Sequence, residues 1–200
     1  MKRLALALAT VFLAAGCSFK GEQPPPPSQA ASADYKYVIG PGDTLSIQVW
    51  RNPELSSTVP VRPDGKVTAP LIEDLVAIGK NPTDLAREIE EKLKKYIQDP
   101  VVTVIVTGFV GPTSEQIRIV GSATRPAALP YRQSMTVLDA MIAVGGITEF
   151  ASGNRAVLVR ASEGNKQYTL RLKDLLQRGD VSANVDLRPG DIVIIPESFF

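Results

Sequence analysis

The segment from Ile39 to Trp50 reads IGPGDTLSIQVW, and a related phrase, LRPGDIVIIP, runs from Leu187 to Pro196. In both phrases a Pro-Gly-Asp turn is followed by a run of strand-forming residues. Proline presets φ and glycine permits a positive φ, so each phrase predicts a tight turn that leads into a β-strand. Two such turns, far apart in the chain, indicate turn chemistry that is used twice rather than a repeat of whole domains.

The residues after the first turn alternate in polarity, which is typical of a half-buried strand. We expect Leu45, Ile47 and Val49 on the buried face, with Thr44, Ser46 and Gln48 on the other. Further along, Arg62-Pro63-Asp64-Gly65 is a tight-turn sequence between two short runs, Val59–Val61 and Lys66–Ala69. This arrangement predicts a β-hairpin.

A helix is predicted to begin after Asn81. Asn81 is suited to cap it, Pro82 fits the first helical position, and Asp84 complements the helix dipole. Apolar residues at helical spacing form a stripe that we expect to be buried: Leu85, Ile89 and Leu93, with Tyr96 or Ile97. Asp99-Pro100 ends the helix, and the β-branched run Val101–Thr107 predicts a strand in the interior of a sheet.

A second unit follows the loop at Gly108–Glu115. Its first strand is expected around Ile117 and Ile119, and a proline-broken loop follows. Thr136 and Asp139 form a capping-box-like pair at the start of a helix that Gly145-Gly146 closes. The apolar stripe expected on this helix is Leu138, Met141 and Ile142. The remaining predicted elements are a hairpin of Ala156–Arg160 and Tyr168–Leu172, a short helix at Lys173–Gln177 and a last strand at Ile192–Ile195.

Both units are therefore predicted to be small α+β modules, in which one main helix packs across a short sheet. We place the first module at residues 35–108 and the second at residues 115–198.

Residues 1–16 have the pattern of a secretory signal peptide. Lys2 and Arg3 give a positive start, and Leu4–Ala15 is apolar or small apart from one threonine and too short to span a bilayer. Small residues then precede Cys17, which resembles the lipobox of bacterial lipoproteins. The resemblance implies cleavage before Cys17 and lipid attachment to its thiol, and Ser18 favours sorting to the outer membrane. The alternative is an ordinary secreted protein that is cut elsewhere.

Residues 17–34 are predicted to be a lipidated, Pro-rich tether. The run Pro24–Pro27 forces an extended polyproline II conformation, and its flanks are small and polar. At about 3.1 Å per residue, such a spacer holds a folded part up to roughly 50 Å from a membrane. A ligand for an SH3-type domain is the alternative interpretation of the proline run.

The composition excludes several classes of function. The sequence has no histidine, which excludes histidine-based catalytic triads, histidine zinc sites and histidine pH switches. Lys2 and Arg3 are two of the 22 basic residues and lie in the predicted signal, so the mature chain would carry 20 basic and 21 acidic residues, a net charge of −1. We therefore expect no nucleic-acid partner. The single cysteine cannot form an internal disulfide.

Residues that resemble catalytic or binding groups have structural interpretations. Asp43, Asp64 and Asp191 each stand in a turn sequence, where aspartate bonds local backbone; a glycosidase would need two placed carboxylates. Trp50 is suited to stack on a sugar ring, but a tryptophan that ends an alternating strand is more often in a core or an interface. We expect no catalytic residue, no cofactor and no metal site, and hence no enzyme.

The order of these motifs resembles a known family. The run YVIGPGDTLSIQVWRNPELSSTVPVRPDGKVTAPLI, with the helix and QDPVVTVIV after it, is similar to the polysaccharide export domain of the Wza-type family. The stretch IRIVGSATRPAALPYRQSMTVLDAMIAVGGITEFASGNRAVLVR, with LRPGDIVIIP at its end, is similar to the SLBB domain, a β-grasp-like module. The resemblance implies a ring-forming, periplasm-facing outer-membrane lipoprotein that helps capsular or exopolysaccharide leave a Gram-negative cell.

The resemblance also implies partners. They are identical copies in a homo-oligomeric ring, exopolysaccharide, an inner-membrane polysaccharide co-polymerase, and the membrane through the lipid anchor. Larger relatives line their outer-membrane pore with a C-terminal helix, whereas this chain ends at Phe200 soon after its last predicted strand. We therefore expect a separate outer-membrane β-barrel to supply the exit. Two alternatives stay open: a monomeric periplasmic carbohydrate- or protein-binding scaffold module, and an envelope enzyme acting on glycans.

Overall fold

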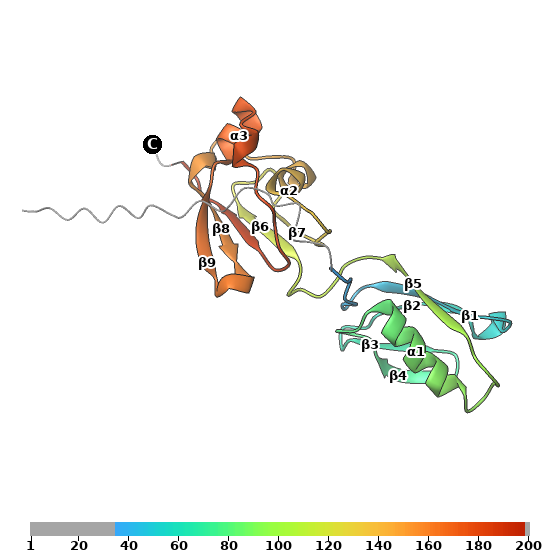
Figure 1. Cartoon of the computed structure of the whole chain (residues 1–200). Helices are drawn as coiled ribbons and strands as arrows, with labels where there is room; N and C mark the ends of the chain where they lie inside the picture. Colours follow the sequence, from blue (N-terminus) through green and yellow to red (C-terminus); the bar gives the residue numbers. More distant parts are fainter. Residues whose placement is uncertain (1–34, 199–200) are drawn as a thin grey trace, which may run out of the picture.

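The computed structural model describes residues 35–198, so the predicted signal peptide, Cys17 and the Pro-rich tether lie outside the described residues. Within this range the chain forms two modules, each with its own hydrophobic core (Figure 1). The first core draws its buried residues from Ile39–Val104, and the second from Ile117–Ile195. Two separate cores along one chain agree with the predicted pair of α+β modules.

The first module contains a three-stranded antiparallel sheet, a two-stranded ribbon and one α-helix. The sheet has the order β2-β1-β5, and the ribbon pairs β3 with β4. In chain order the elements are β1 (Thr44–Val49), a 3₁₀ helix (Pro53–Leu55), β2 (Ser57–Pro60), β3 (Lys66–Ala69), β4 (Ile72–Val76), α1 (Pro82–Leu93) and β5 (Val102–Gly108).

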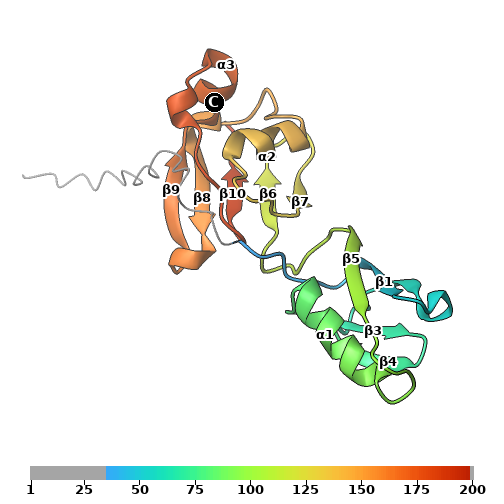
Figure 2. The same ribbon diagram turned by 45° about the vertical axis from the view of Figure 1, so that its right-hand side comes forward.

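The second module is built on a five-stranded sheet with the order β7-β6-β10-β8-β9, in which the β6–β10 pair is parallel and the other pairs are antiparallel. Its strands are β6 (Ile117–Gly121), β7 (Ala127–Leu129), β8 (Ala156–Arg160), β9 (Lys166–Leu170) and β10 (Ile192–Ile195). Its helices are α2 (Val137–Val144) and α3 (Leu172–Arg178), with 3₁₀ helices at Gly153–Arg155, Ala161–Glu163 and Val181–Ala183. Figure 2 shows α1 and α2 each lying across a sheet of their own module.

The predicted alternation of β1 is confirmed. Its buried side chains are Leu45, Ile47 and Val49, and they face the apolar side of α1, whose buried residues are Leu85, Ala86, Ile89 and Leu93. At the start of α1 the side chain of Asn81 accepts a hydrogen bond from the backbone N–H of Asp84 at 2.9 Å, and Pro82 occupies the first helical position. This helix therefore begins for the reasons that its sequence predicted.

Helix α1 also holds the start of β5. The carboxylate of Glu90 accepts a hydrogen bond from the backbone N–H of Val102 at 2.8 Å, and the guanidinium of Arg87 donates to the carbonyl of Val102 at 3.1 Å. Arg87 and Glu90 also form an ion pair at 2.6 Å. The first residue of β5 thus has its backbone groups satisfied by the helix that covers its sheet.

The predicted hairpin in the first module is wrong, although its turn forms. The backbone N–H of Arg62 donates to the carbonyl of Lys66 at 2.9 Å, and the N–H of Gly65 donates to the carbonyl of Arg62 at 2.8 Å. The flanking strands do not pair with each other, because β2 joins β1 and β3 joins β4. Turn chemistry reverses the chain locally, whereas the pairing of the strands depends on which neighbours bury their apolar faces.

The predicted interior position of the Val101–Thr107 run is also wrong. Strand β1 is central, and β5 lies at an edge of the sheet. Helix α1 covers one face of β5, while residues on the other face are exposed, including Ile105 at 42%. β-branched residues favour a strand on either face, so their continuous run did not specify burial on both.

Helix α2 has the predicted start and end but a different buried stripe. The Thr136 side chain accepts from the backbone N–H of Asp139, the Asp139 carboxylate accepts from the backbone N–H of Thr136, and Gly145 caps the other end with a left-handed conformation. The residues turned to the core are Val137, Ala140, Met141 and Val144. Ile142 is 69% exposed and Leu138 is only partly buried. The expected stripe is therefore correct at Met141, partly correct at Leu138, which packs against the core, and wrong at Ile142.

The expected proline-broken loop contains the edge strand β7. Strand β7 begins directly after Pro126. It pairs antiparallel with β6, with Ile117 opposite Leu129. Proline lacks a backbone N–H and is tolerated at the start of an edge strand, so it did not exclude pairing here. The β8–β9 hairpin and β10 form as predicted, except that β9 begins at Lys166 and ends at Leu170, and Leu172 begins α3.

Candidate functional site

The two Pro-Gly-Asp turns have the same local geometry. The glycine of each turn has a positive φ, 89° in the first and 82° in the second. An oxygen of Asp43 accepts a hydrogen bond from the backbone N–H of Gly40 at 2.9 Å, and an oxygen of Asp191 accepts from Arg188 at 2.9 Å. Each aspartate therefore closes its own turn, as the sequence predicted.

Asp43 has a second role that the sequence did not reveal. Its other oxygen accepts hydrogen bonds from the backbone N–H groups of Val110, at 2.7 Å, and Gly111, at 2.8 Å. The Tyr37 hydroxyl donates to the same carboxylate at 2.7 Å. Burial and this hydrogen bond to Asp43 raise the pKa of Tyr37. The fully buried carboxylate thus ties the turn before β1 to the connector that leads to the second module.

Tyrosine side chains bridge the junction between the modules. The Tyr35 hydroxyl donates to the Glu115 carboxylate at 2.9 Å, and the Tyr35 ring meets Tyr131 edge-on, with centroids 5.0 Å apart. Tyr37 packs edge-on against Phe109 at 5.3 Å. Tyr35 and Tyr37 belong to the segment before β1, so this segment contacts both the connector and the second module.

Asp191 is buried in the second module beside Arg160. The guanidinium Nε of Arg160 lies 3.5 Å from an Asp191 carboxylate oxygen, an ion pair without hydrogen-bond geometry, and another Arg160 nitrogen donates to the carbonyl of Asp186 at 2.8 Å. Burial raises the pKa of Asp191. Asp43 and Asp191 therefore belong to two separate cores, and they are not the paired carboxylates that glycoside hydrolysis requires.

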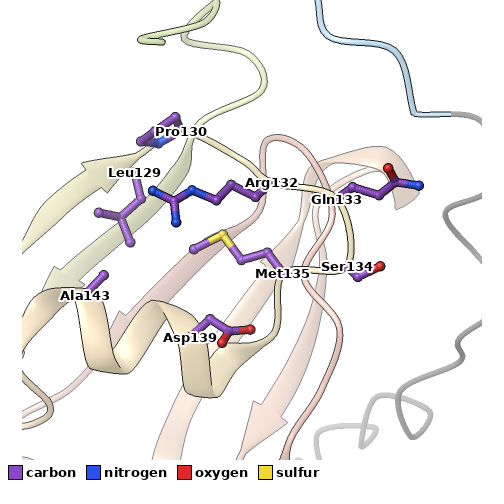
Figure 3. A pocket seen from close by; sticks show the side chains of 8 residues that line it. All are labelled: Leu129, Pro130, Arg132, Gln133, Ser134, Met135, Asp139 and Ala143. Carbon is purple, nitrogen blue, oxygen red and sulfur yellow. The ribbon is translucent and has the colours of Figure 1, made fainter. Parts of the chain in front are cut away.

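A pocket in the second module lies between β7, the following loop and α2 (Figure 3). Its volume is about 280 Å³, and its lining residues are Leu129, Pro130, Arg132, Gln133, Ser134, Met135, Asp139 and Ala143. Arg132 and Met135 extend across it toward Leu129, and the side chain of Arg132 makes no hydrogen bond or ion pair with any described residue. Asp139 is occupied by its bonds to Thr136. The pocket offers a cationic group beside an apolar wall.

A second hollow lies in the first module, at the end of β1. Its volume is about 390 Å³, and Trp50 stands on its rim with 68% of its surface exposed. This exposure excludes a place in the core, one of the two positions expected for Trp50; the other was an interface. Asp64, in contrast, lies in its exposed turn, where it pairs with Arg62 and accepts from the backbone N–H of Lys66, as predicted.

Residues 35–198 hold no group of three or more histidine, cysteine, aspartate or glutamate side chains placed to bind a metal ion. The helices described there are too short or too polar to cross a bilayer. The one predicted site residue, Cys17, lies outside the described residues.

Comparison with family models assigns both modules. Residues 31–107 match the polysaccharide biosynthesis/export protein family, and residues 115–195 match the SLBB domain. The first module thus belongs to the polysaccharide biosynthesis/export protein family, and the second is an SLBB domain. The match confirms the predicted resemblance and, together with the structure, the α+β fold class. Proteins of this family are transport components and not enzymes.

Relatives from several bacteria share both modules. EPS I polysaccharide export outer membrane protein EpsA of Ralstonia nicotianae is 29% identical over 185 residues, which cover 80% of this chain and 47% of EpsA. Capsule polysaccharide export protein BexD of Haemophilus influenzae is 28% identical over 80% of this chain and 43% of BexD. Capsule polysaccharide export outer membrane protein CtrA of Neisseria meningitidis is 30% identical over 76% of this chain and 42% of CtrA. The chain thus spans less than half the length of these relatives.

Proposed function

We propose that this protein is a component of an outer-membrane machine that exports capsular or exopolysaccharide. The observation that carries the proposal is that its two modules match, in order, the export family and the SLBB domain. The names of its relatives support both polysaccharide as the cargo and the outer membrane as the location.

In this proposal the protein is a lipoprotein that faces the periplasm. Residues 1–16 are removed as a signal peptide, and acyl chains on Cys17 anchor the mature chain. Several acyl chains anchor a protein far more firmly than one. Residues 17–34 tether the two modules, at residues 35–108 and 115–198, to the membrane.

The proposal assigns the two modules to a ring of identical copies around the path of the polymer. Such a ring uses head-to-tail contacts between two different surfaces of each copy. An inner-membrane polysaccharide co-polymerase and a separate outer-membrane exit protein complete the path. Cross-linking in intact cells, followed by identification of the linked peptides, tests both partners.

A second candidate function is a monomeric periplasmic binding module. The pocket in Figure 3 favours it, because an apolar wall beside the Arg132 guanidinium suits a small anionic ligand. The oligomeric state separates the two functions, since the export proposal requires a closed assembly.

Deletion in the source bacterium tests the export function. We expect the deletion strain to lose polysaccharide from its surface and medium and to retain it within the cell, and the full chain should restore release. Total polysaccharide in whole-cell extracts controls for a defect in synthesis. Unchanged release from the deletion strain would contradict the proposal.

A further inference from the structure

The position of Trp50 follows from the alternation of β1. Val49 is buried at the end of this strand, so the next side chain points to the opposite face, where Gln48 is already exposed. Trp50 is therefore on the solvent side of the sheet, with 68% of its surface exposed. It is the one tryptophan in the sequence. Tryptophan is enriched at interfaces, because its ring offers a large apolar face and its indole N–H a polar edge.

The backbone around Trp50 is held in place. The N–H of Trp50 donates to the carbonyl of Val101 at 2.9 Å, and the side-chain amide of Asn52 donates to the carbonyl of Trp50 at 3.1 Å. The N–H of Asn52 donates to the carbonyl of Val49 at 3.2 Å, which closes the turn. The backbone that carries the indole is thus fixed before anything binds, which lowers the entropy cost of binding.

Arg51 stands beside the indole in an unusual conformation. Its φ of 62° lies in the left-handed region, which is strained for a residue other than glycine. Its guanidinium makes no hydrogen bond or ion pair with any described residue. Backbone strain of this kind concentrates at functional sites. A free cation with five donors therefore borders the exposed ring.

The hollow next to these residues has walls of mixed chemistry. Its volume of about 390 Å³ falls in the range of small-molecule sites. The side chains that line it are Gln48, Val49, Trp50, Arg51, Pro53, Ser56, Val101 and Thr103. Gln48 and Thr103 are opposite one another on β1 and β5, and both are exposed. Amide and hydroxyl groups that donate and accept hydrogen bonds thus surround one flat aromatic face.

The hollow continues into the open face of the β2-β1-β5 sheet, opposite α1. Side chains on this face of the three described strands are uncharged. Most of them carry hydroxyl groups, namely Thr44, Ser46, Thr58, Thr103 and Thr107, and the others are Gln48, Pro60 and Ile105. Such a surface presents hydrogen-bonding groups along its length without strong electrostatic attraction at any point. An extended, hydroxylated chain fits this chemistry.

We propose that the hollow beside Trp50 binds a pyranose ring of a polysaccharide chain. One C–H face of the sugar stacks on the indole, Gln48 and Thr103 hydrogen-bond its hydroxyl groups, and Arg51 donates to a hydroxyl or carboxylate of the same or the next sugar. This inference rests on the proposed export function, which supplies the polymer. A second copy of the chain fits less well, because a stable interface needs about 800 Å² per partner around an apolar core.

Tryptophan fluorescence of the full-length, detergent-extracted protein tests the site, since all tryptophan emission comes from Trp50. The probes are cello-oligosaccharides as neutral pyranoses, oligogalacturonates as acidic ones, and fragments of the polysaccharide that the source bacterium secretes. We expect at least one probe to change the emission saturably. Arg51→Ala should weaken that binding about fivefold or more, with the larger effect on an acidic probe. Failure of all three probes would overturn the proposal.

Calorimetric titration extends the test to variants without the fluorophore. Trp50→Ala should abolish binding, and Trp50→Phe should retain part of it because a flat ring remains. Phe150→Ala is the matched control, since Phe150 is an aromatic residue of the second module with 60% of its surface exposed. Wild-type affinity in Trp50→Ala would overturn the site. Loss of the oligomer in Trp50→Ala, with no saccharide binding in the wild type, would assign the hollow to a contact between copies.

Release of polysaccharide from cells separates this inference from the export function. A deletion strain that still exports would overturn the export function, whatever the purified protein binds. If export needs the chain but Trp50→Ala exports normally and the wild type binds no probe, only the saccharide site is wrong.

Discussion

Asp43 combines a local and a long-range task in one buried carboxylate. Its oxygens accept hydrogen bonds from the backbone of Gly40, Val110 and Gly111 and from the Tyr37 hydroxyl. The first contact lies within its own turn, whereas the connector residues are 67 and 68 positions away in sequence. One side chain thus couples the start of the central strand to the link between the modules.

Removal of the Asp43 carboxylate should destabilise the first module strongly. We expect Asp43→Ala to lower the free energy of unfolding by roughly 3 kcal/mol or more, because each buried donor left without a partner costs about 1–3 kcal/mol. Urea unfolding of the full chain, followed by circular dichroism, measures the change. Asp64→Ala is the control, since Asp64 lies in an exposed turn, where the loss of its ion pair and hydrogen bond should cost far less. Equal losses in the two variants would refute the role given to Asp43.

Tyr37 should make stability depend on pH in the alkaline range. Burial and the hydrogen bond to Asp43 raise its pKa, so the folded protein keeps the phenol proton where the unfolded chain, with a tyrosine pKa near about 10, loses it. The resulting stability is complete below about pH 10 and is lost as the pH rises further. Tyr37→Phe should therefore show a shallower fall in unfolding free energy above about pH 10. Tyr96→Phe, at an exposed position, should keep the wild-type slope.

Single residues show where sequence reasoning succeeds and where it stops. The turn role of Asp43 was predictable because proline, glycine and aspartate act within four residues, but its bonds to Val110 and Gly111 carry no local signal. For Trp50 a signal was present that excluded the core, one of the two places expected for this residue. The alternation that buries Leu45 places Trp50 on the polar face with Gln48, so exposure followed from the same pattern.

Helices and strands were predictable to the extent that their ends are set by local chemistry. Asn81 and Thr136 cap α1 and α2 as expected, and β10 has the predicted bounds. The pairing partners of the strands and the buried faces of the helices were harder to predict from the sequence. The turn at residues 62–65 forms, yet β2 pairs with the preceding strand β1 and β3 with the following strand β4, because the packing of cross-strand side chains, and not the turn, decides the pairing.

The cap of α1 can be tested by a single substitution. Asn81→Ala should lower the free energy of unfolding by about 1 kcal/mol, because it leaves the backbone N–H of Asp84 without its partner. Thr83→Ala is the matched control, at an exposed position in the first turn of the same helix that does not cap it. Denaturant unfolding of both variants decides the point, and a Thr83→Ala loss as large as that of Asn81→Ala would contradict it.

Over the whole molecule, two modules with separate cores meet at a junction of aromatic and hydrogen-bonded contacts. Tyr35 reaches Glu115 and Tyr131, and Asp43 holds the connector. These contacts oppose independent motion of the modules, because the segment before β1 bonds to both sides of the link. A ring of identical copies closes only if each copy turns the path by the same angle. A fixed angle between the two modules of each copy helps the ring to close, because deviations from that angle add up from copy to copy.

The proposed anchor predicts where the whole molecule resides. Cys17→Ala should lose radiolabelled palmitate and leave the membrane fraction, because the acyl chains on Cys17 are the proposed attachment. Ser18→Ala keeps the thiol and should remain lipidated. A Cys17→Ala protein that stays membrane-bound after a carbonate wash would show that another part of the chain holds it.

The proposed ring predicts a closed assembly of fixed size. A head-to-tail interface that closes on itself gives one stoichiometry, so sedimentation in mild detergent should show a single large species over a wide range of concentration. Tyr35→Ala removes the contacts to Glu115 and Tyr131 without touching either core, so the modules should stay folded while the assemblies become heterogeneous in size. Tyr96→Ala, which removes an exposed tyrosine beyond the end of α1, should leave the assembly unchanged.

Monomer alone at every concentration, in detergent and in membranes, would refute the ring and favour the monomeric binding module. A uniform ring in Tyr35→Ala would show that the copies hold the angle through their interface, and not through the junction within each chain.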